Sequence, residues 1–255
     1  MNRLLMGICV FLLASLTSGS AQAQADFKGF YIGANGGTNL GRAQLDTTPS
    51  FSPTGYFAQT STPAISAASN QNVDATRYTF GGQAGYNFQW DNFVVGVEAD
   101  FERTPLSGST TVTQVYPCCS PTTFTVNQTV ESNWLFTARP RMGVVFGKLL
   151  AYGTVGYAAT SVKYSALFTD TFATAHENAA FDQNKSGWVV GGGGEFQLSR
   201  HLFLRGEYLY AGFGAVTTST NLTAFTPPIA FPSNVFTHTV DLRAQLARGG
   251  VNFRF

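Results

Sequence analysis

The chain has 255 residues, of which 44% are hydrophobic and only 11% are charged, whereas an average soluble domain is about 25% charged. Its 15 basic and 14 acidic residues nearly balance, which argues against a nucleic-acid-binding protein and against a disordered acidic chain. A helical membrane protein is also excluded, because no stretch of the sequence contains about 18 consecutive apolar residues.

The N-terminal segment has the pattern of a secretory signal peptide. Arg3 provides the positive start, residues 4–16 form an apolar stretch too short to cross a membrane as a helix, and small residues precede a cleavage site after Ala23. We therefore expect residues 1–23 to be removed and residues 24–255 to form one exported domain. The mature chain would then carry 14 basic residues, 14 acidic residues and two cysteines.

From residue 29 onward, apolar and polar side chains alternate with a period of two, which is typical of β-strands with two different faces. In residues 77–88 and 93–102, for example, the aromatic and aliphatic side chains share one face of each strand. Placing Phe88 opposite Phe93 keeps both apolar faces on the same side. The alternation predicts eight strands, at residues 29–40, 77–88, 93–102, 134–146, 150–163, 188–198, 202–210 and 237–255.

The connections between these strands alternate sharply in length. Three are tight turns, near residues 90, 148 and 200. Four are long segments rich in Thr, Ser, Ala, Asn and Pro, at roughly 42–75, 104–132, 164–185 and 213–236. Such long connections are uncommon in a compact soluble domain, whereas short turns on one side and long loops on the other are the plan of an outer-membrane barrel.

The predicted fold class is therefore all-β. We expect an eight-stranded antiparallel up-and-down transmembrane β-barrel with short periplasmic turns, long extracellular loops and both termini in the periplasm.

Two aromatic bands predict that the apolar face of the barrel points outward, into lipid, as in the interface girdles of membrane barrels. The band beside the short turns contains Phe88, Trp90, Phe93, Phe146 and Tyr152. The band toward the long loops contains Tyr78, Trp134, Phe136, Tyr208 and Tyr210. We take Gly147, Lys148 and Leu149 as the turn before residues 150–163. The alternation does not decide which face of this strand points outward, and we expect Leu150, Tyr152 and Thr154 on the outward side.

The charged residues lie on the opposite face of the strands, which we expect to line the interior. Arg139 and Arg141 would each cost about 2–4 kcal/mol if they faced lipid at mid-membrane. Glu195 lies opposite Arg205 if the turn near residue 200 is tight. The predicted interior charge network consists of Glu98, Asp100, Glu102, Arg139, Arg141, Glu195, Arg205 and Glu207.

Two interpretations of this network are open. Because side chains can fill the interior of an eight-stranded barrel and the charges nearly cancel, we favour a salt-bridged plug. A polar conduit for solutes is the alternative.

Five stretches and the C-terminal end carry a family resemblance. They read GFYIGANGG (29–37), GGQAGYNFQ (81–89) with VGVEADF (95–101), Trp134 with ARPRMG (138–143), LAYGTVGYA (150–158), GWVVGGGG (187–194) with RGEYLY (205–210), and RGGVNFRF (248–255). These stretches resemble the Gram-negative outer-membrane β-barrel domain family, the porin-like outer-membrane immunogenic protein group related to the OmpA transmembrane barrel. Together they touch every predicted strand.

The resemblance implies insertion by the outer-membrane assembly machinery, which in this group reads an aromatic-ended last strand, here Phe253 and Phe255. It implies no shared catalytic residues. Pro140 departs from a glycine that is common in the family, and it indicates a bulge or a local break in the ladder of strand hydrogen bonds.

Residues outside the strands give few signs of chemistry. Cys118 and Cys119 are adjacent, so their Cα atoms would lie about 3.8 Å apart, closer than in most disulfides; a vicinal disulfide and two free thiols both stay open. No metal or other cofactor is predicted, because the three histidines show no metal-ligand spacing. The nearest candidate acid–base set is His238, Asp241 and Thr239, and nothing in the sequence fixes an activated nucleophile there.

These observations predict a monomeric integral outer-membrane protein with a structural and surface-contact role, not an enzyme. Its expected partners are outer-membrane lipid and lipopolysaccharide, with the assembly machinery during biogenesis, and no nucleic acid. The alternatives are a narrow channel for small solutes and an outer-membrane enzyme acting on lipid or surface substrates.

Overall fold

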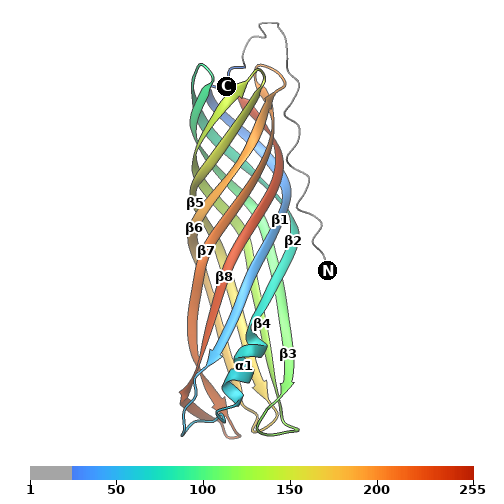
Figure 1. The fold of residues 1–255 in the computed structure, drawn as a ribbon, viewed down its shortest axis with the longest axis vertical. Helices are drawn as coiled ribbons and strands as arrows, with labels where there is room; N and C mark the ends of the chain where they lie inside the picture. Colours follow the sequence, from blue (N-terminus) through green and yellow to red (C-terminus); the bar gives the residue numbers. More distant parts are fainter. Residues whose placement is uncertain (1–24) are drawn as a thin grey trace.

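The computed structural model describes residues 25–255, so the predicted signal peptide, residues 1–23, lies outside the described residues. Eight antiparallel strands follow one another around the ring, and β1 pairs with β8 to close it (Figure 1). The strands are β1 (Gly29–Pro49), β2 (Gln71–Trp90), β3 (Phe93–Val115), β4 (Thr123–Phe146), β5 (Leu149–Asp170), β6 (His176–Gln197), β7 (Leu202–Ala224) and β8 (Ile229–Arg254). Over this range α1 (Ser61–Ser69) is the single helix. The predicted eight-stranded antiparallel barrel is confirmed.

The barrel is long and has two distinct ends. The turn end carries the C-terminus and three short turns, at residues 91–92, 147–148 and 198–201. The loop end carries α1 and four connections, at residues 50–70, 116–122, 171–175 and 225–228. The strands have 20 to 26 residues, whereas about 9–11 residues of a tilted strand suffice to span a membrane. About half of each strand therefore extends beyond the length that a membrane requires.

The four long loops predicted from the sequence are wrong in extent, because the strands continue through most of those segments. In the predicted loop 104–132, for example, only residues 116–122 connect β3 to β4. The added strand segments also alternate, but in the opposite sense: Phe124 and Val126 are buried, while Asn127 is exposed. The prediction took apolar side chains as outward-facing, so it did not recognise strands whose apolar side chains face inward.

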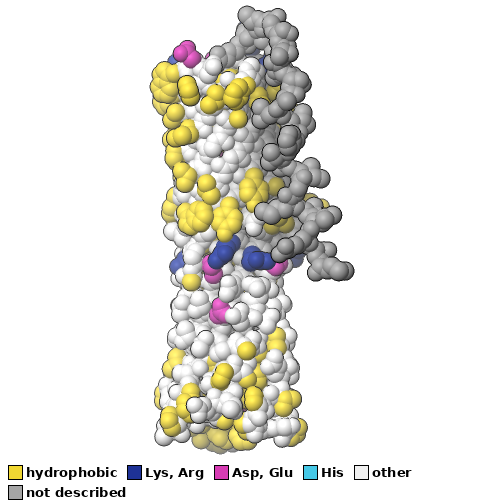
Figure 2. Space-filling view, viewed as in Figure 1, with side chains coloured by type: hydrophobic (Ala, Val, Ile, Leu, Met, Phe, Trp, Pro, Cys, Tyr) yellow, Lys and Arg dark blue, Asp and Glu magenta, His cyan; other side chains and the backbone are white. Residues whose placement is uncertain are grey.

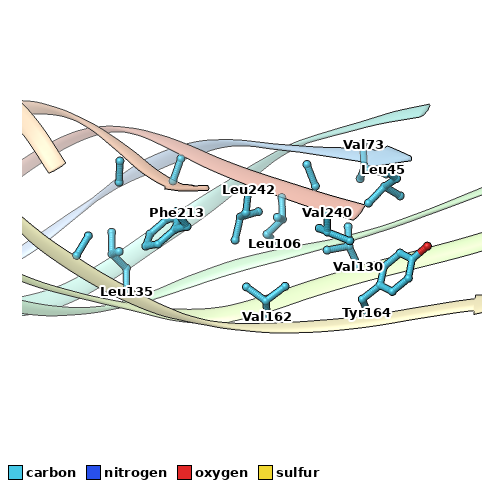
Figure 3. Packing of buried hydrophobic residues seen from close by; sticks show 14 of the residues in the cluster. Leu45, Val73, Leu106, Val130, Leu135, Val162, Tyr164, Phe213, Val240 and Leu242 are labelled. Atoms are coloured by element: carbon cyan, nitrogen blue, oxygen red, sulfur yellow. The ribbon is translucent and has the colours of Figure 1, made fainter. Parts of the chain in front are cut away.

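The alternation thus reverses along the barrel and divides it into two halves, which we call the turn half and the loop half. In the turn half, Arg139 and Arg141 are buried and the neighbouring Met142 is exposed. In the loop half, apolar side chains fill the interior, as in a soluble barrel. Figure 3 shows this apolar layer, with Leu106 and Leu242 among the side chains packed between the strands.

Two turns show how register controls facing. The β2–β3 turn places Trp90, not Phe88, opposite Phe93; this is a shift of two residues, which leaves the predicted facing unchanged. The predicted outward facing of Leu150, Tyr152 and Thr154 is wrong, since all three are buried. The β4–β5 turn contains only residues 147–148, so Leu149 pairs with the outward-facing Phe146. The resulting shift of one residue reverses the face of every following side chain.

Pro140 lies at a local break in the β4–β5 ladder. The pairing passes from Ala138–Tyr157 to Arg141–Thr154 without a change of register, and the hydroxyl of Thr154 donates to the carbonyl of Pro140 at 2.8 Å. Of the two predicted outcomes, a bulge or a local break, the structure has the local break.

Candidate functional site

The outer surface of the turn half is apolar and carries two aromatic bands (Figure 2). Beside the short turns, Phe88, Trp90, Phe93 and Phe146 are exposed, whereas Tyr152 points inward and does not belong to the band. Toward the loop half, Tyr78 and Tyr208 are exposed, and Trp134, Phe136 and Tyr210 are half-buried. A belt of charged side chains follows this second band (Figure 2). These features are those of a surface that faces lipid between two interfaces.

The interior of the turn half holds the charged residues that the sequence analysis assigned to it. All eight are buried and point into the barrel, and the structure brings them together in one network. The tight β6–β7 turn places Glu195 opposite Arg205, as predicted. Because the side chains of these ion pairs are at most 3% exposed, the pairs lie in a nearly dry interior.

Glu98 is the centre of the network. Arg205 donates to both of its carboxylate oxygens, at 2.5 and 2.6 Å, and Arg139 donates at 2.7 Å. Arg141 lies 3.4 Å from the same carboxylate, and the Tyr31 hydroxyl donates to it at 2.6 Å. One carboxylate from β3 therefore serves three guanidinium groups from β4 and β7.

The other carboxylates extend the network across the barrel. Glu207 accepts hydrogen bonds from Arg205 at 2.6 Å and from Arg139 at 3.2 Å. Asp100 accepts from Arg139 at 2.6 Å and from the hydroxyl of Thr137 at 2.7 Å.

The part of the network nearest the turn end is formed by Glu195. This carboxylate accepts from Arg141 at 2.6 Å and from the Asn252 amide at 3.0 Å. The Nε of Arg141 donates to Asn87 at 2.9 Å, so charged and amide side chains form one connected layer.

Three members of the network were missed by the sequence analysis. Arg248 of β8 binds Glu207 at 2.6 Å, contacts Asp100 at 3.1 Å and also pairs with Glu102. Its position in the alternation of the last strand, between the outward-facing Ala247 and Gly249, could have revealed it. Tyr31 and Tyr152 also point inward, and the hydroxyl of Tyr152 donates to Glu207 at 2.9 Å.

With Arg248 included, the network has five carboxylates and four guanidinium groups. A small cavity lies on each of two sides of the network. Each has a volume of about 10 Å³, which is room for about one water molecule. One is lined in part by Tyr31 and Glu195 toward the turn end, and the other by Leu106 and Leu242 toward the loop half.

Further layers fill the interior on both sides of the network. Toward the turn end lies an apolar layer of Ala25, Phe27, Val94, Val145, Leu150, Tyr152 and Phe203. Toward the loop end lies the apolar cluster of Figure 3 and, at the mouth, a second cluster that includes Phe57, Ile65, Phe124, Phe168 and Phe236. Ile65 belongs to α1, so this helix helps to close the mouth.

The structure does not bring the candidate acid–base set together. His238 is buried, whereas Asp241 is partly exposed and pairs with Arg243. The imidazole instead lies 3.1 Å from Glu177 and 2.8 Å from the hydroxyl of Thr47. Both partners lie inside predicted loops, 42–75 and 164–185, so the sequence analysis could not place them beside His238.

Cys118 and Cys119 lie at the loop end and are joined by a disulfide, with Cα atoms 3.8 Å apart. Both line a cavity of about 140 Å³ near the barrel mouth, together with Tyr56, Phe57, Ser61, Tyr116, Asp170 and Phe172. Tyr56 and Tyr116 donate to the same oxygen of Asp170, at 2.6 and 3.1 Å. Burial raises the pKa of the Tyr116 phenol, which keeps this donor protonated.

Phe253 and Phe255 lie at the turn end on the outward face of the last strand, and both are exposed. Their rings are 5.3 Å apart, and the ring of Phe255 lies 5.7 Å from that of Phe30 in β1. The two aromatic residues therefore sit at the seam where β8 closes against β1.

Two features are absent from residues 25–255. No group of three or more His, Cys, Asp or Glu side chains in this part of the chain could hold a metal ion. No helix there is long and apolar enough to cross a membrane.

An eight-stranded barrel with an apolar outer face, two aromatic bands and a charged interior defines the class of outer-membrane β-barrel proteins. The sequence pattern of the family described as outer membrane protein beta-barrel domain matches residues 9–255, and the chain belongs to this family. Membership places the protein in the cell outer membrane.

The curated relatives agree with this assignment. The chain is 32% identical over 188 residues to the 31 kDa outer-membrane immunogenic proteins of Brucella melitensis and Brucella suis, covering 73% of this chain and 71% of each relative. Among solved structures, the outer membrane protease OmpT from Escherichia coli aligns with a TM-score of 0.49 at 8% identity, over 94% of this chain and 99% of that chain. Neisserial surface protein A aligns with a TM-score of 0.30 at 12% identity, over 89% and 98%.

Proposed function

We propose that this protein is a sealed, non-conducting outer-membrane barrel with a structural and surface-contact role. The observation that carries the proposal is the filled interior: four guanidinium and five carboxylate groups interlock across the turn half, and apolar clusters pack the loop half. A solute would have to displace both layers. The cavities of about 10 Å³ beside the network support the same conclusion.

The orientation in the membrane is part of the proposal. The turn half carries the lipid-compatible surface, and the turn end carries the short turns and the C-terminus, which in membrane barrels lie in the periplasm. The loop half then projects from the cell surface as a rigid extension. Its outward side chains are largely Thr, Ser and Asn, which suit exposure to water.

Surface contact is assigned to the loop end. Exposed apolar side chains lie on its connections, among them Phe51, Phe172 and Phe225, and at the first residue of β8, Ile229. Exposed apolar groups that gather in this way mark interaction sites. The relatives in Brucella are named as immunogenic proteins, which fits a surface-exposed position for this chain as well.

A catalytic role is not proposed. His238 lies between Thr47 and Glu177 in the loop half, and all three side chains are buried, so the Thr47 hydroxyl is not accessible to a substrate. The partners proposed during biogenesis are the assembly machinery, through Phe253 and Phe255, and the mature protein is proposed to be a monomer without a nucleic-acid partner.

Single-channel recording in planar bilayers tests the sealed interior. We expect the purified barrel to show no stable conductance. The variant Arg139→Ala/Arg141→Ala removes two guanidinium groups from the centre of the network. It should produce stable, salt-dependent openings because it empties space next to the small cavity that Asn87 and Glu195, the partners of Arg141, help to line.

The matched control is Lys163→Ala/Lys185→Ala, which removes two cations from the outside of the loop half and should stay silent. Stable conductance of the unmodified protein would establish the narrow-channel alternative instead. A change in the mass of lipid A that requires both the protein and His238 would establish the enzyme alternative.

A further inference from the structure

A belt of charged side chains crosses the visible face of the barrel where the turn half meets the loop half (Figure 2). The belt follows the second aromatic band directly. On β1 the exposed Leu40 is followed two residues later by Arg42, and on β3 the exposed Phe101 is followed two residues later by Arg103. The cations thus lie where the outer surface changes from apolar to polar, which is the depth of lipid headgroups if the turn half spans the membrane.

The cations are concentrated on one side of the belt. Four neighbouring strands, β8, β1, β2 and β3, carry Arg243, Arg42, Arg77 and Arg103 on this border, with Asp74 and Asp241 as the acidic residues among them. On the other side, Lys163 and Lys185 are balanced by Asp182 and Glu131. The first side, which we call the arginine sector, therefore has a net charge of +2 at the border, or +1 when Asp46, four residues beyond Arg42 in β1, is included, and the second is neutral.

The arrangement of charges within the arginine sector favours the binding of an anion. Arg42 and Arg243 are direct partners across the β1–β8 ladder, and like charges in this position repel each other. Arg42 donates two hydrogen bonds to Asp74, at 2.7 and 3.2 Å, and Arg243 binds Asp241 at 2.8 Å and also Tyr210. Because both guanidinium groups are more than half exposed, these ion pairs contribute little to stability.

Two further guanidinium groups in the sector have no carboxylate partner among the described residues. Arg77 donates only to the carbonyl of the adjacent Thr76, at 3.1 Å, and Arg103 makes no ion pair. Both are exposed; Arg77 precedes Tyr78, whose side chain is 86% exposed, and Arg103 pairs with Phe80 across the β2–β3 ladder. Guanidinium groups bind phosphate through paired hydrogen bonds, and an exposed aromatic ring suits the interface beside a headgroup.

We propose that the arginine sector is a binding site for the phosphorylated headgroup of lipopolysaccharide, with the lipid A phosphates on the arginines and the acyl chains along the apolar turn half. This inference rests on the proposed orientation in the membrane. It requires a ligand that carries at least two phosphates and acyl chains together, since the cations stand directly beside the lipid-compatible surface. Free phosphate would gain nothing from the aromatic band or from the apolar strands.

Titration of the refolded mature chain with diphosphoryl lipid A, in micelles of a zwitterionic detergent, tests the site through the rise in Tm. We expect Arg77→Gln/Arg103→Gln to bind about tenfold more weakly than the unmodified chain, as for the loss of two surface ion pairs. Arg42→Gln/Arg243→Gln should weaken binding at least as much, because Asp74 and Asp241 are then left to repel the phosphates. The matched control Lys163→Gln/Lys185→Gln should stay within about twofold.

Two further ligands identify the source of the phosphate. Dephosphorylated lipid A should bind the unmodified chain weakly, and inorganic phosphate should not compete with diphosphoryl lipid A. The site is refuted if both arginine variants and the lysine control lose affinity equally, if dephosphorylated lipid A binds as well, or if inorganic phosphate competes. Conductance of the same preparations separates this result from the proposed function: a silent barrel without lipid A preference refutes the site alone, and a conducting barrel refutes the sealed interior alone.

Discussion

Replacing Glu98 by glutamine should lower the free energy of unfolding by about 3–5 kcal/mol, the range found when one partner of a buried ion pair is removed. The glutamine keeps the shape of the side chain but removes the charge that faces Arg139, Arg141 and Arg205. Three guanidinium groups would then remain in a dry interior with fewer acceptors. Urea unfolding in lipid vesicles, followed by tryptophan fluorescence, measures the loss.

The control for this prediction is Asp182→Asn, which neutralises the partner of Lys163 in an ion pair whose side chains are 61% and 50% exposed. Water solvates both groups there, so the change should cost less than about 1 kcal/mol. A cost for Glu98→Gln as small as that of the control would mean that water reaches the network, and it would contradict a sealed interior. Heat-modifiable mobility on gels confirms that each variant has formed the barrel.

The charge network was largely predictable from the sequence because short turns fix register over short distances. Because the β6–β7 turn is short, it places Glu195 opposite Arg205. The β2–β3 turn was misplaced by two residues, and even so every side chain kept its predicted face. The β4–β5 turn was misplaced by one residue. The prediction therefore put Tyr152 on the outer surface, although its side chain lies in the interior.

The loop half was not predictable by the same rule, because the rule itself changes there. An apolar residue faces outward when lipid is the solvent and inward when water is the solvent. Phe124 and Val126 face inward, as in a barrel surrounded by water. The prediction assumed outward-facing apolar residues along the whole chain, so it assigned their strand to a loop. The partners of His238 could not be found either, since Thr47 is 191 residues away in the sequence and only closure of β8 against β1 brings it near.

Apolar side chains of the loop half face inward, so two neighbouring residues of β5 there should contribute differently to stability. Phe168 is 1% exposed within the cluster at the mouth, whereas Leu167, the residue before it, is 46% exposed. Phe168→Ala should lower the free energy of unfolding by about 3–5 kcal/mol, because it removes a large side chain and leaves a cavity. Leu167→Ala should change it by about 0.5 kcal/mol or less, as for other surface positions. Urea unfolding in lipid vesicles compares the two.

Arginine at outward positions distinguishes the two solvents directly. Val97, which is 59% exposed in the middle of the turn half, faces lipid in the proposed orientation, so Val97→Arg should cost about 2–4 kcal/mol. Leu167→Arg also places a charge on an outward apolar position, but in the loop half, where water solvates it and the cost should be near zero. Equal costs at both positions would mean that lipid or water surrounds the whole barrel, and the boundary would then not lie at the charged belt. A large cost at Val97 alone places the membrane around the turn half, because no other difference between these two exposed aliphatic side chains would make only one of them intolerant of a charge.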